Sequence, residues 1–200
     1  MTLGRIAYPL TLNFRILVLG QTIDGSDAGG APVCFVKQKA FRLKEDVSVY
    51  RDESQSEQLY RIRADRIIDI GARYDIADSS GTRIGAVKQR GMRSFWRATY
   101  DILDANGQSI GLIHEENPWV KVLDALLGEI PLLGLVLQMF VNPAYIVEAP
   151  VGQPALRVRK RRSLVERRFI VDEIGAVPPT LDRIVVPSLL MMVLLERGRG

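Results

Sequence analysis

Apolar and polar residues alternate along residues 10–19, near the start of the chain. The apolar positions are Leu10, Leu12, Phe14, Ile16 and Val18. Because successive side chains of a strand point to opposite faces, this period of two predicts a half-buried β-strand. We interpret it as the first strand of the fold.

A sequence repeat lies further along the chain, at an offset of 26 residues. Residues 74–89 read YDIADSSGTRIGAVKQ, and residues 100–115 read YDILDANGQSIGLIHE. In both copies an Asp is followed three residues later by a Gly. This pair favours a type I turn, because the carboxylate accepts backbone N–H groups and Gly tolerates a positive φ. Each copy therefore predicts a β-hairpin whose two arms alternate.

Weaker copies of the hairpin are predicted on both sides of this repeat. Upstream, two arms flank the polar tip at residues 52–58, and residues 23–32 (IDGSDAGGAP) are predicted to join the first strand to a strand at 33–37. Downstream, residues 145–159 turn at Pro150–Gly152, and Phe169–Val171 supplies a last strand.

Helical pattern is confined to two segments. Residues 184–196 are almost continuously apolar, and Pro187 suits a first turn, where its missing N–H costs nothing. This run is too short for a bilayer, which needs about 20 residues, and a helix that is apolar all round is typical of a protein core. Residues 118–141 form an apolar helical insertion, which Gly128 and Pro131 divide into an amphipathic half and an apolar half.

Length and composition fit a single β-rich domain spanning residues 1–200. The chain is 47% hydrophobic and 25% charged, as in ordinary globular proteins. A lone cysteine, Cys34, excludes an internal disulfide, and a lone histidine, His114, removes most zinc and triad chemistry. The chain contains no G-x-S-x-G, Walker or H-E-x-x-H motif. We predict an all-β binding module that is not an enzyme and needs no cofactor or metal.

The Y-D-I-x-D-x-x-G-x-x-I-G hairpins, closed by one apolar C-terminal helix, resemble the Tubby C-terminal-like superfamily. The likeness is strongest to its LURP-one-related and phospholipid-scramblase-like branch and covers roughly residues 33–117 and 143–196. It implies a closed antiparallel barrel of about twelve strands around a buried helix, here residues 184–196. Lipid binding is associated with the tubby proteins and scrambling is claimed for others, but no ligand-binding motif carries over to this chain. The insertion at 118–141 departs from the pattern.

The repeated aspartates Asp75, Asp78, Asp101 and Asp104 have two interpretations. Calcium needs six to eight oxygens that converge on one point, and acidic calcium loops are richer than D-x-x-G. Turn capping accounts for Asp78 and Asp104 directly, and we favour it.

His114, with Glu115 and Glu116 after it, has a catalytic or metal-binding interpretation and a structural one. A lone histidine after an alternating strand is more often a packed or solvated residue. Cys34 lies between Val33 and Phe35, where we expect a small buried hydrophobic side chain.

The basic patch, residues 157–168 (RVRKRRSLVERR), is the strongest functional candidate. It contains one acidic residue and seven basic ones, which are Arg157, Arg159, Lys160, Arg161, Arg162, Arg167 and Arg168. In a strand, two of the four consecutive cations from Arg159 to Arg162 would point toward the core, so we expect this row in a turn or loop.

Three ligand states of this patch stay open. In the first, the patch is a solvated face with no specific ligand. In the second, it binds anionic lipid, where each cation contributes about 1 kcal/mol to binding. In the third, it binds nucleic-acid phosphate or an acidic protein. No aromatic residue interrupts the patch, which disfavours stacking on single strands.

The insertion at 118–141 also has three interpretations: a lid or homo-oligomer contact, a hairpin that dips into a membrane, or a spanning helix. Asp124 opposes the last, because an acidic residue at that depth costs about 3 kcal/mol. The residues expected to contact a membrane or partner are Trp119, Lys121, Leu132, Leu133, Leu135, Leu137 and Phe140.

These features lead to one favoured hypothesis and two alternatives. In the favoured one, the module associates peripherally with anionic membranes, because the basic patch and the insertion supply the two signals that stable anchoring needs. The alternatives are an intracellular scaffold protein and a nucleic-acid binder. Since Asn13 and Arg15 interrupt the first apolar stretch, we recognise no secretory signal and expect a cytoplasmic location.

Overall fold

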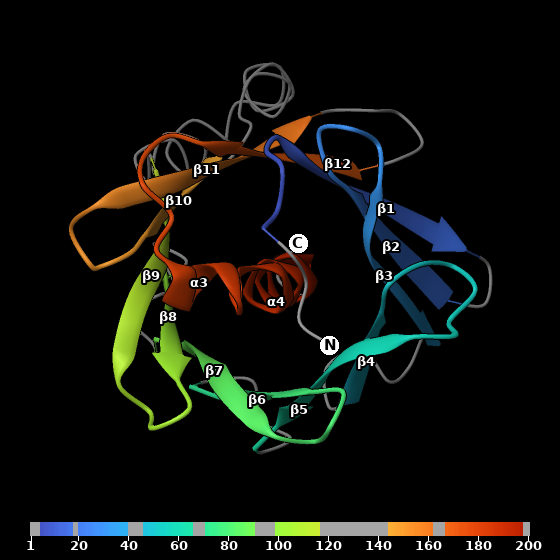
Figure 1. Cartoon of the computed structure of the whole chain (residues 1–200), viewed down its shortest axis with the longest axis horizontal. Helices are drawn as coiled ribbons and strands as arrows, with labels where there is room; N and C mark the ends of the chain where they lie inside the picture. Colours follow the sequence, from blue (N-terminus) through green and yellow to red (C-terminus); the bar gives the residue numbers. More distant parts are fainter. Residues whose placement is uncertain are drawn as a thin grey trace, which may run out of the picture.

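Antiparallel strands close into one barrel around a helix (Figure 1). The computed structural model describes residues 5–17, 20–39, 46–65, 71–90, 99–116, 144–161 and 167–197. Its twelve strands are β1 (Leu10–Leu17), β2 (Gly20–Ser26), β3 (Pro32–Lys39), β4 (Asp46–Tyr50), β5 (Gln58–Ala64), β6 (Arg73–Asp78), β7 (Arg83–Gln89), β8 (Thr99–Asp104), β9 (Ser109–Glu115), β10 (Ala144–Glu148), β11 (Pro154–Arg161) and β12 (Arg167–Glu173). The prediction of an all-β closed barrel is confirmed.

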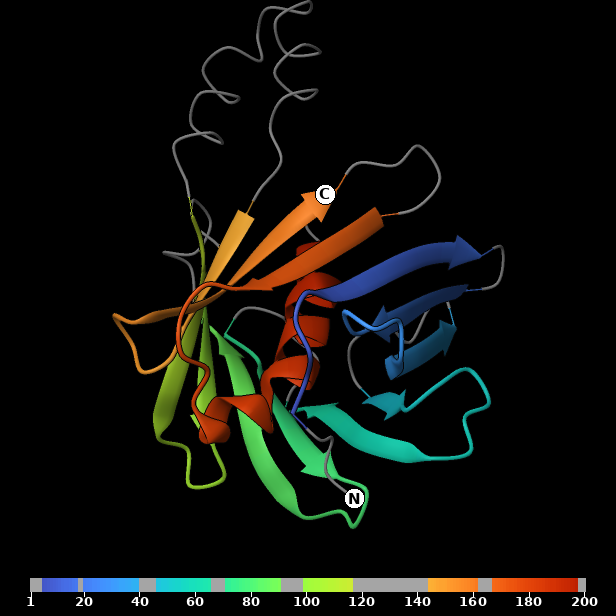
Figure 2. The same ribbon diagram turned by 45° about the horizontal axis from the view of Figure 1, so that its top comes forward.

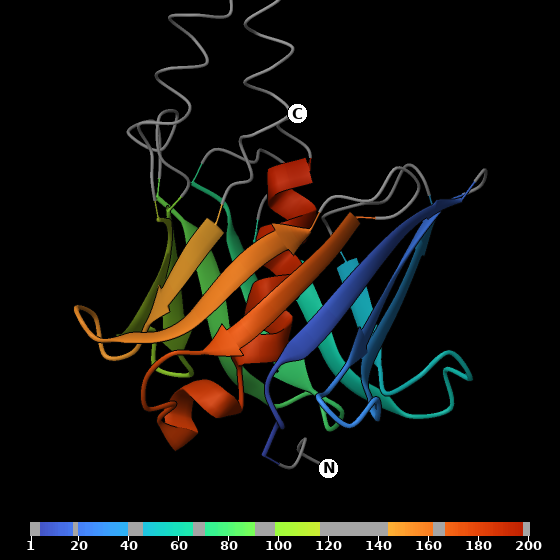
Figure 3. The ribbon, with the colours of Figure 1, turned by 90° about the horizontal axis from the view of Figure 1, so that it is seen from above.

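Each strand pairs with its neighbours in sequence, and the pairing of β1 with β12 closes the barrel. In this closing pair Leu10 lies opposite Val171, and Phe14 lies opposite Arg167. The odd-numbered strands therefore all run toward the same end of the barrel (Figure 3). We call this the loop end, where β1, β3, β5, β7, β9 and β11 finish, and we call the opposite end, where they begin, the turn end.

The predicted alternation of β1 is confirmed. Leu10, Leu12 and Phe14 are at most 2% exposed and face the barrel interior, whereas Asn13 and Arg15 form polar contacts on the outer wall. Burial of each such apolar side chain stabilises the fold by about 1.5–3 kcal/mol. The interior is thus apolar along this strand, as the sequence pattern requires.

The two repeated hairpins are β6–β7 and β8–β9, and their turns form as predicted. The Oδ1 atom of Asp78 accepts the backbone N–H groups of Ser80 at 2.9 Å and Thr82 at 3.0 Å. Asp104 does the same for the two equivalent residues of its own turn. The glycine three residues after each aspartate has a φ near +85°, which is why glycine is favoured there.

The same turn recurs at Asp27, within the segment predicted to be a connection, and at Asp52, in the polar tip of the hairpin predicted upstream of the repeat. Asp27 Oδ1 accepts two backbone N–H groups, and Asp52 Oδ1 accepts that of Ser54 at 2.9 Å. In the second of these turns Gln55 occupies the glycine position, with a φ of 56°. Consecutive hairpins of the barrel therefore share one turn design, which the sequence shows only in its two clearest copies.

The prediction that residues 23–32 form a connection is wrong for the first four residues, and Pro32 is already the first residue of β3. Residues 20–26 are strand β2, which pairs with both β1 and β3. Gly25 lies within the segment predicted to be a connection, and its role in β2 is steric. A Cβ at this position would lie 2.5 Å from Cys34 Sγ and 3.0 Å from Leu12 Cδ2, so the glycine permits close packing inside the barrel.

Helix α4 (Val185–Arg197) fills the barrel and matches the predicted core helix (Figure 2). Its residues from Val185 to Leu195 are all buried. A helix surrounded by sheet has no face toward water, which explains its continuously apolar sequence. The preceding turn of helix, α3 (Pro179–Asp182), was not predicted.

Candidate functional site: the basic patch at the loop end

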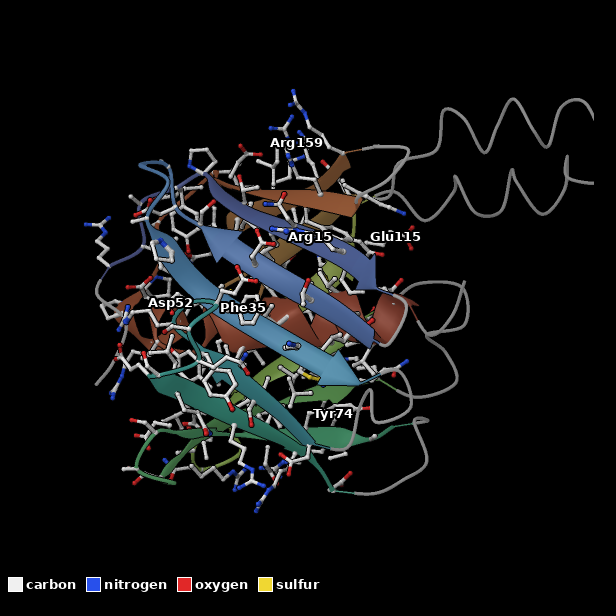
Figure 4. All side chains as sticks on the ribbon, turned by 90° about the vertical axis from the view of Figure 1, so that its right-hand side faces the viewer. Arg15, Phe35, Asp52, Tyr74, Glu115 and Arg159 are labelled. Atoms are coloured by element: carbon white, nitrogen blue, oxygen red, sulfur yellow. The ribbon has the colours of Figure 1, made fainter. Side chains whose placement is uncertain are left out.

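Strand β11 carries most of the described part of the basic patch. Arg157 and Arg159 alternate with the buried Val158, so their side chains lie on the outer wall of the barrel, where Figure 4 labels Arg159. Arg157 forms an ion pair of 2.9 Å with Glu116, and Arg159 forms one of 2.7 Å with Asp172. Both pairs are partly exposed to solvent.

The expectation that the cation row lies in a turn or loop is wrong for Arg159, Lys160 and Arg161. These residues are the last three of β11, paired with Ile170, Phe169 and Arg168 of β12. Arg159 and Arg161 are exposed, whereas Lys160 is half-buried. At the end of a strand, a lysine on the inward side can bury its aliphatic stem without burying its charge in the core.

Arg168 extends the patch onto β12 and β1. It lies opposite both Arg161 and Asn13, and its Nε donates to Asn13 Oδ1 at 2.9 Å. Asn13 in turn donates to Asp24. Arg167 begins β12, but its side chain and the whole of Arg162 lie outside the described residues. The patch is therefore a surface that crosses several strands rather than one loop.

The insertion at 118–141 lies outside the described residues, and so do all of the membrane or partner contacts predicted in it. Its flanks are described. Glu116, two residues before it, accepts the ion pair from Arg157, and Ala144, three residues after it, lies opposite Arg159 in the β10–β11 ladder. The chain thus leaves and re-enters the barrel beside the basic patch.

The helices that the structure describes include none long and apolar enough to span a bilayer.

The aspartates of the repeat serve the turns and the outer wall. The Ser80 hydroxyl, with backbone N–H groups, holds the pKa of Asp78 below its ordinary range. Asp75 pairs with Arg73 at 2.9 Å, and Asp101 pairs with Arg90 at 2.7 Å. No group of three or more potential metal-ligating side chains occurs within the described ranges. The turn interpretation of Asp78 and Asp104 is confirmed.

His114 and Cys34 occupy structural positions. His114 Nε2 lies 3.0 Å from Glu148 Oε1, and the two side chains are 15% and 17% exposed. Glu148 also accepts the backbone N–H of Gly152, which fixes the adjoining turn. Cys34 is 1% exposed, and burial raises the pKa of its thiol to about 12. A thiol that stays protonated is a poor nucleophile.

A polar cluster at the loop end of the interior was missed from the sequence. Tyr100 and Tyr145, both at most 3% exposed, donate their hydroxyls to Glu196 Oε1 at 2.5 Å and Oε2 at 2.9 Å. Burial, with the nearby Glu196 carboxylate, raises the pKa of Tyr145. The cluster anchors the last turn of α4 to β8 and β10. The sequence feature that could have indicated this cluster is Glu196, a glutamate at the end of an otherwise apolar helix.

Two shallow clefts lie on either side of the β6–β7 turn. One has a volume of about 520 Å³ and is lined by Arg61, Arg63 and Arg83 among others. The other has a volume of about 500 Å³ and lies between the two repeated turns and α3, beside Arg183. Both mix arginines with aspartates.

Comparison with known proteins supports the fold alone. No family model matches the sequence, and no curated protein matches it. The structure is similar to the X-ray structure of the Arabidopsis thaliana protein AT5G01750, with a TM-score of 0.52 and 13% sequence identity. The similarity covers 97% of this chain and 94% of that one.

Proposed function

We propose that this protein is a non-catalytic module that associates peripherally with anionic membranes through the basic patch at its loop end. The side chains of Arg159, Arg161 and Arg168 are exposed together on adjacent strands. Each cation near an anionic leaflet contributes about 1 kcal/mol, so several on one surface recruit a domain that a single one would not.

The observation that carries this proposal is the position of the insertion's flanks. Glu116 contacts Arg157, and Ala144 pairs with Arg159. The basic patch and the two described flanks of the apolar segment 118–141 therefore lie at the same part of the barrel. Stable peripheral binding needs two such signals acting together, and their common origin supports this mechanism over a solvated charge run.

The ion pairs within the patch do not oppose this role. Arg157 and Arg159 are 44% and 53% exposed at their side chains, and their partners are about one-third exposed. Pairs this exposed contribute at most about 1 kcal/mol, so lipid phosphates compete with them at little cost. On this proposal the protein works on the cytoplasmic leaflet, which carries the anionic lipids.

Membership of the Tubby C-terminal-like superfamily is part of the same proposal. A closed barrel of twelve strands around a buried C-terminal helix supports it. The resemblance also places lipid binding among the expected properties, although it matches no ligand-binding residue.

The test is co-sedimentation with phosphatidylcholine vesicles, with and without phosphatidylserine. We expect salt-sensitive binding that requires phosphatidylserine and is lost in the double variant Arg161→Glu/Arg168→Glu. Neither arginine forms an ion pair among the described residues. The change removes one exposed hydrogen bond, from Arg168 to Asn13, and should leave the fold intact, which circular dichroism would check.

Two results would count against the proposal. The absence of binding to either vesicle would retire it, and the insertion would then be studied as a lid or subunit contact by sedimentation velocity. Salt-sensitive binding to an oligonucleotide but not to vesicles would instead favour nucleic acid as the partner.

A further inference from the structure

Basic side chains are not confined to the patch but occur on most strands at the loop end of the barrel. These strands are β1, β3, β5, β6, β7, β11 and β12, and one further basic residue lies just beyond β7. Described basic side chains within two residues of this end are Arg15, Lys37, Arg63, Arg73, Lys88, Arg90, Arg159, Lys160, Arg161 and Arg168. We call this set the basic rim.

The turn end has the opposite character. Figure 4 labels Asp52 there, far along the barrel from its loop end. Acidic side chains at this end outnumber the basic Arg5, Arg51, Arg83 and Arg183, and they are Asp27, Asp52, Glu53, Glu57, Asp78, Asp104, Glu148, Glu173 and Asp182. The molecule therefore carries its charge asymmetrically along the barrel axis.

Acidic side chains neutralise part of the rim. Asp46 is held by Arg61 and Arg63, Asp75 by Arg73, and Asp101 by Arg90. Two further rim cations are paired, because Arg15 contacts Asp24 at 2.8 Å and Arg159 contacts Asp172 at 2.7 Å. Lys37 and Lys88 are exposed and form no hydrogen bond or ion pair within the described part of the chain. These two lysines are available to an external anion.

The length of the barrel lets its two ends act separately. Strands of seven or eight residues, such as β5 and β11, rise about 25 Å, whereas salt screens charges over about 8 Å at physiological ionic strength. When the loop end meets an anionic surface, its cations are attracted, and the acidic turn end lies beyond the range of repulsion.

From this asymmetry we infer that the whole basic rim faces the anionic lipid surface, with the barrel axis crossing the membrane plane and the turn end directed away from it. The inference rests on the proposed function, and it extends the contact from one patch to strands on the other sides of the loop end, β3, β5 and β7. The alternative is a barrel lying on its side, with only β11 and β12 against the lipid.

Three basic residues distinguish the two orientations, because they lie on walls away from the patch. In the barrel order, β3 with Lys37 and β7 with Lys88 are each four strands from β11, and β5 with Arg63 is on the opposite side. A barrel on its side would hold at least one of these walls clear of the membrane. An upright barrel brings all three rim positions close to it.

The experiment measures partition of the whole protein onto vesicles of phosphatidylcholine and phosphatidylserine for the single variants Lys37→Gln, Arg63→Gln and Lys88→Gln. We expect each to weaken binding about fivefold, the equivalent of about 1 kcal/mol per charge. Arg183→Gln is the matched control, since it removes one exposed charge at the turn end, and it should leave binding unchanged. Thermal unfolding confirms that each variant is folded.

The outcomes separate the inference from the proposed function. If the wild type binds and Arg161→Glu/Arg168→Glu does not, but Arg63→Gln and either lysine variant bind normally, the patch acts alone and the upright orientation is wrong. An equal loss in Arg183→Gln would also overturn it, because net charge rather than position would then decide. If the wild type fails to bind, both ideas fall together.

Discussion

The aspartate at the start of a hairpin turn accepts backbone N–H groups that the turn leaves unpaired. It does so in four turns, at Asp27, Asp52, Asp78 and Asp104. The residue three positions later adopts a positive φ in every one of them. Glycine meets this requirement at three positions, and Gln55 meets it at a cost, because a Cβ is strained in the left-handed region.

Exchange of the residues at this position should therefore alter stability in opposite directions. We expect Gln55→Gly to raise the free energy of unfolding by about 0.5–1 kcal/mol and Gly107→Gln to lower it by about 1 kcal/mol or more. Urea unfolding at neutral pH measures both. Equal destabilisation by the two changes would show that side-chain contacts of Gln55, and not backbone strain, govern its turn.

At the scale of elements, the helix and the sheet depend on each other. The barrel interior supplies an apolar environment on every side of α4, and α4 supplies the volume that the inward side chains leave unfilled. Packing is tight at β7 beside the start of the helix, where a Cβ on Gly85 would overlap Ile184 Cδ1 and the Leu103 carbonyl oxygen of β8. Gly85 belongs to the sequence repeat, which we interpreted as a hairpin and its turn. The sequence therefore did not predict the steric role of this glycine.

Gly85→Ala should separate β7 from the start of the helix. We expect it to lower the free energy of unfolding by about 1–3 kcal/mol, the usual cost of overpacking a core. Gly29→Ala is the matched control, since its added Cβ would meet only Asp27 Oδ1 at 3.4 Å, and it should be nearly neutral. A neutral Gly85→Ala in chemical unfolding would mean that the contact relaxes easily.

At the scale of the whole molecule, the buried titratable groups make stability depend on alkaline pH. Burial raises the pKa of Cys34 from 9.0 to about 12 and that of Tyr60 from 10.0 to about 12, and it raises the pKa of Tyr8 and Tyr145 as well. All four groups are neutral when protonated, so the fold favours the protonated form. Their contribution is complete below the unfolded pKa values and is lost as pH rises through the folded ones.

Stability should therefore be insensitive to these groups up to about pH 9 and fall above it. Each group that ionises only in the unfolded chain removes about 1.4 kcal/mol per pH unit. Denaturant midpoints between pH 8 and about pH 11 measure the slope. Cys34→Ala should flatten the first part of the decline, from about pH 9 to 10, where the thiol alone titrates. An unchanged slope there would assign the decline to the tyrosines.

Local pattern was sufficient to predict the hairpins, their turns and the core helix. Alternation along β1, the D-x-x-G turns and the apolar run of residues 184–196 each depend on residues close in sequence. The sequence also identified the basic patch, because its cations are consecutive. These features follow from the intrinsic geometry of a strand, a turn and a helix, which acts over a few residues.

Long-range packing decided the rest. The steric role of Gly25 depends on Cys34, which lies beside it only in the folded barrel. Pairing with β12 places Arg159–Arg161 in a strand, where the sequence predicted a turn or loop. The meeting of Glu116 with Arg157, and the separation of basic from acidic side chains along the barrel, depend on strands that are distant in sequence. Closure of β1 onto β12 sets these positions, because it fixes which end of every strand points the same way.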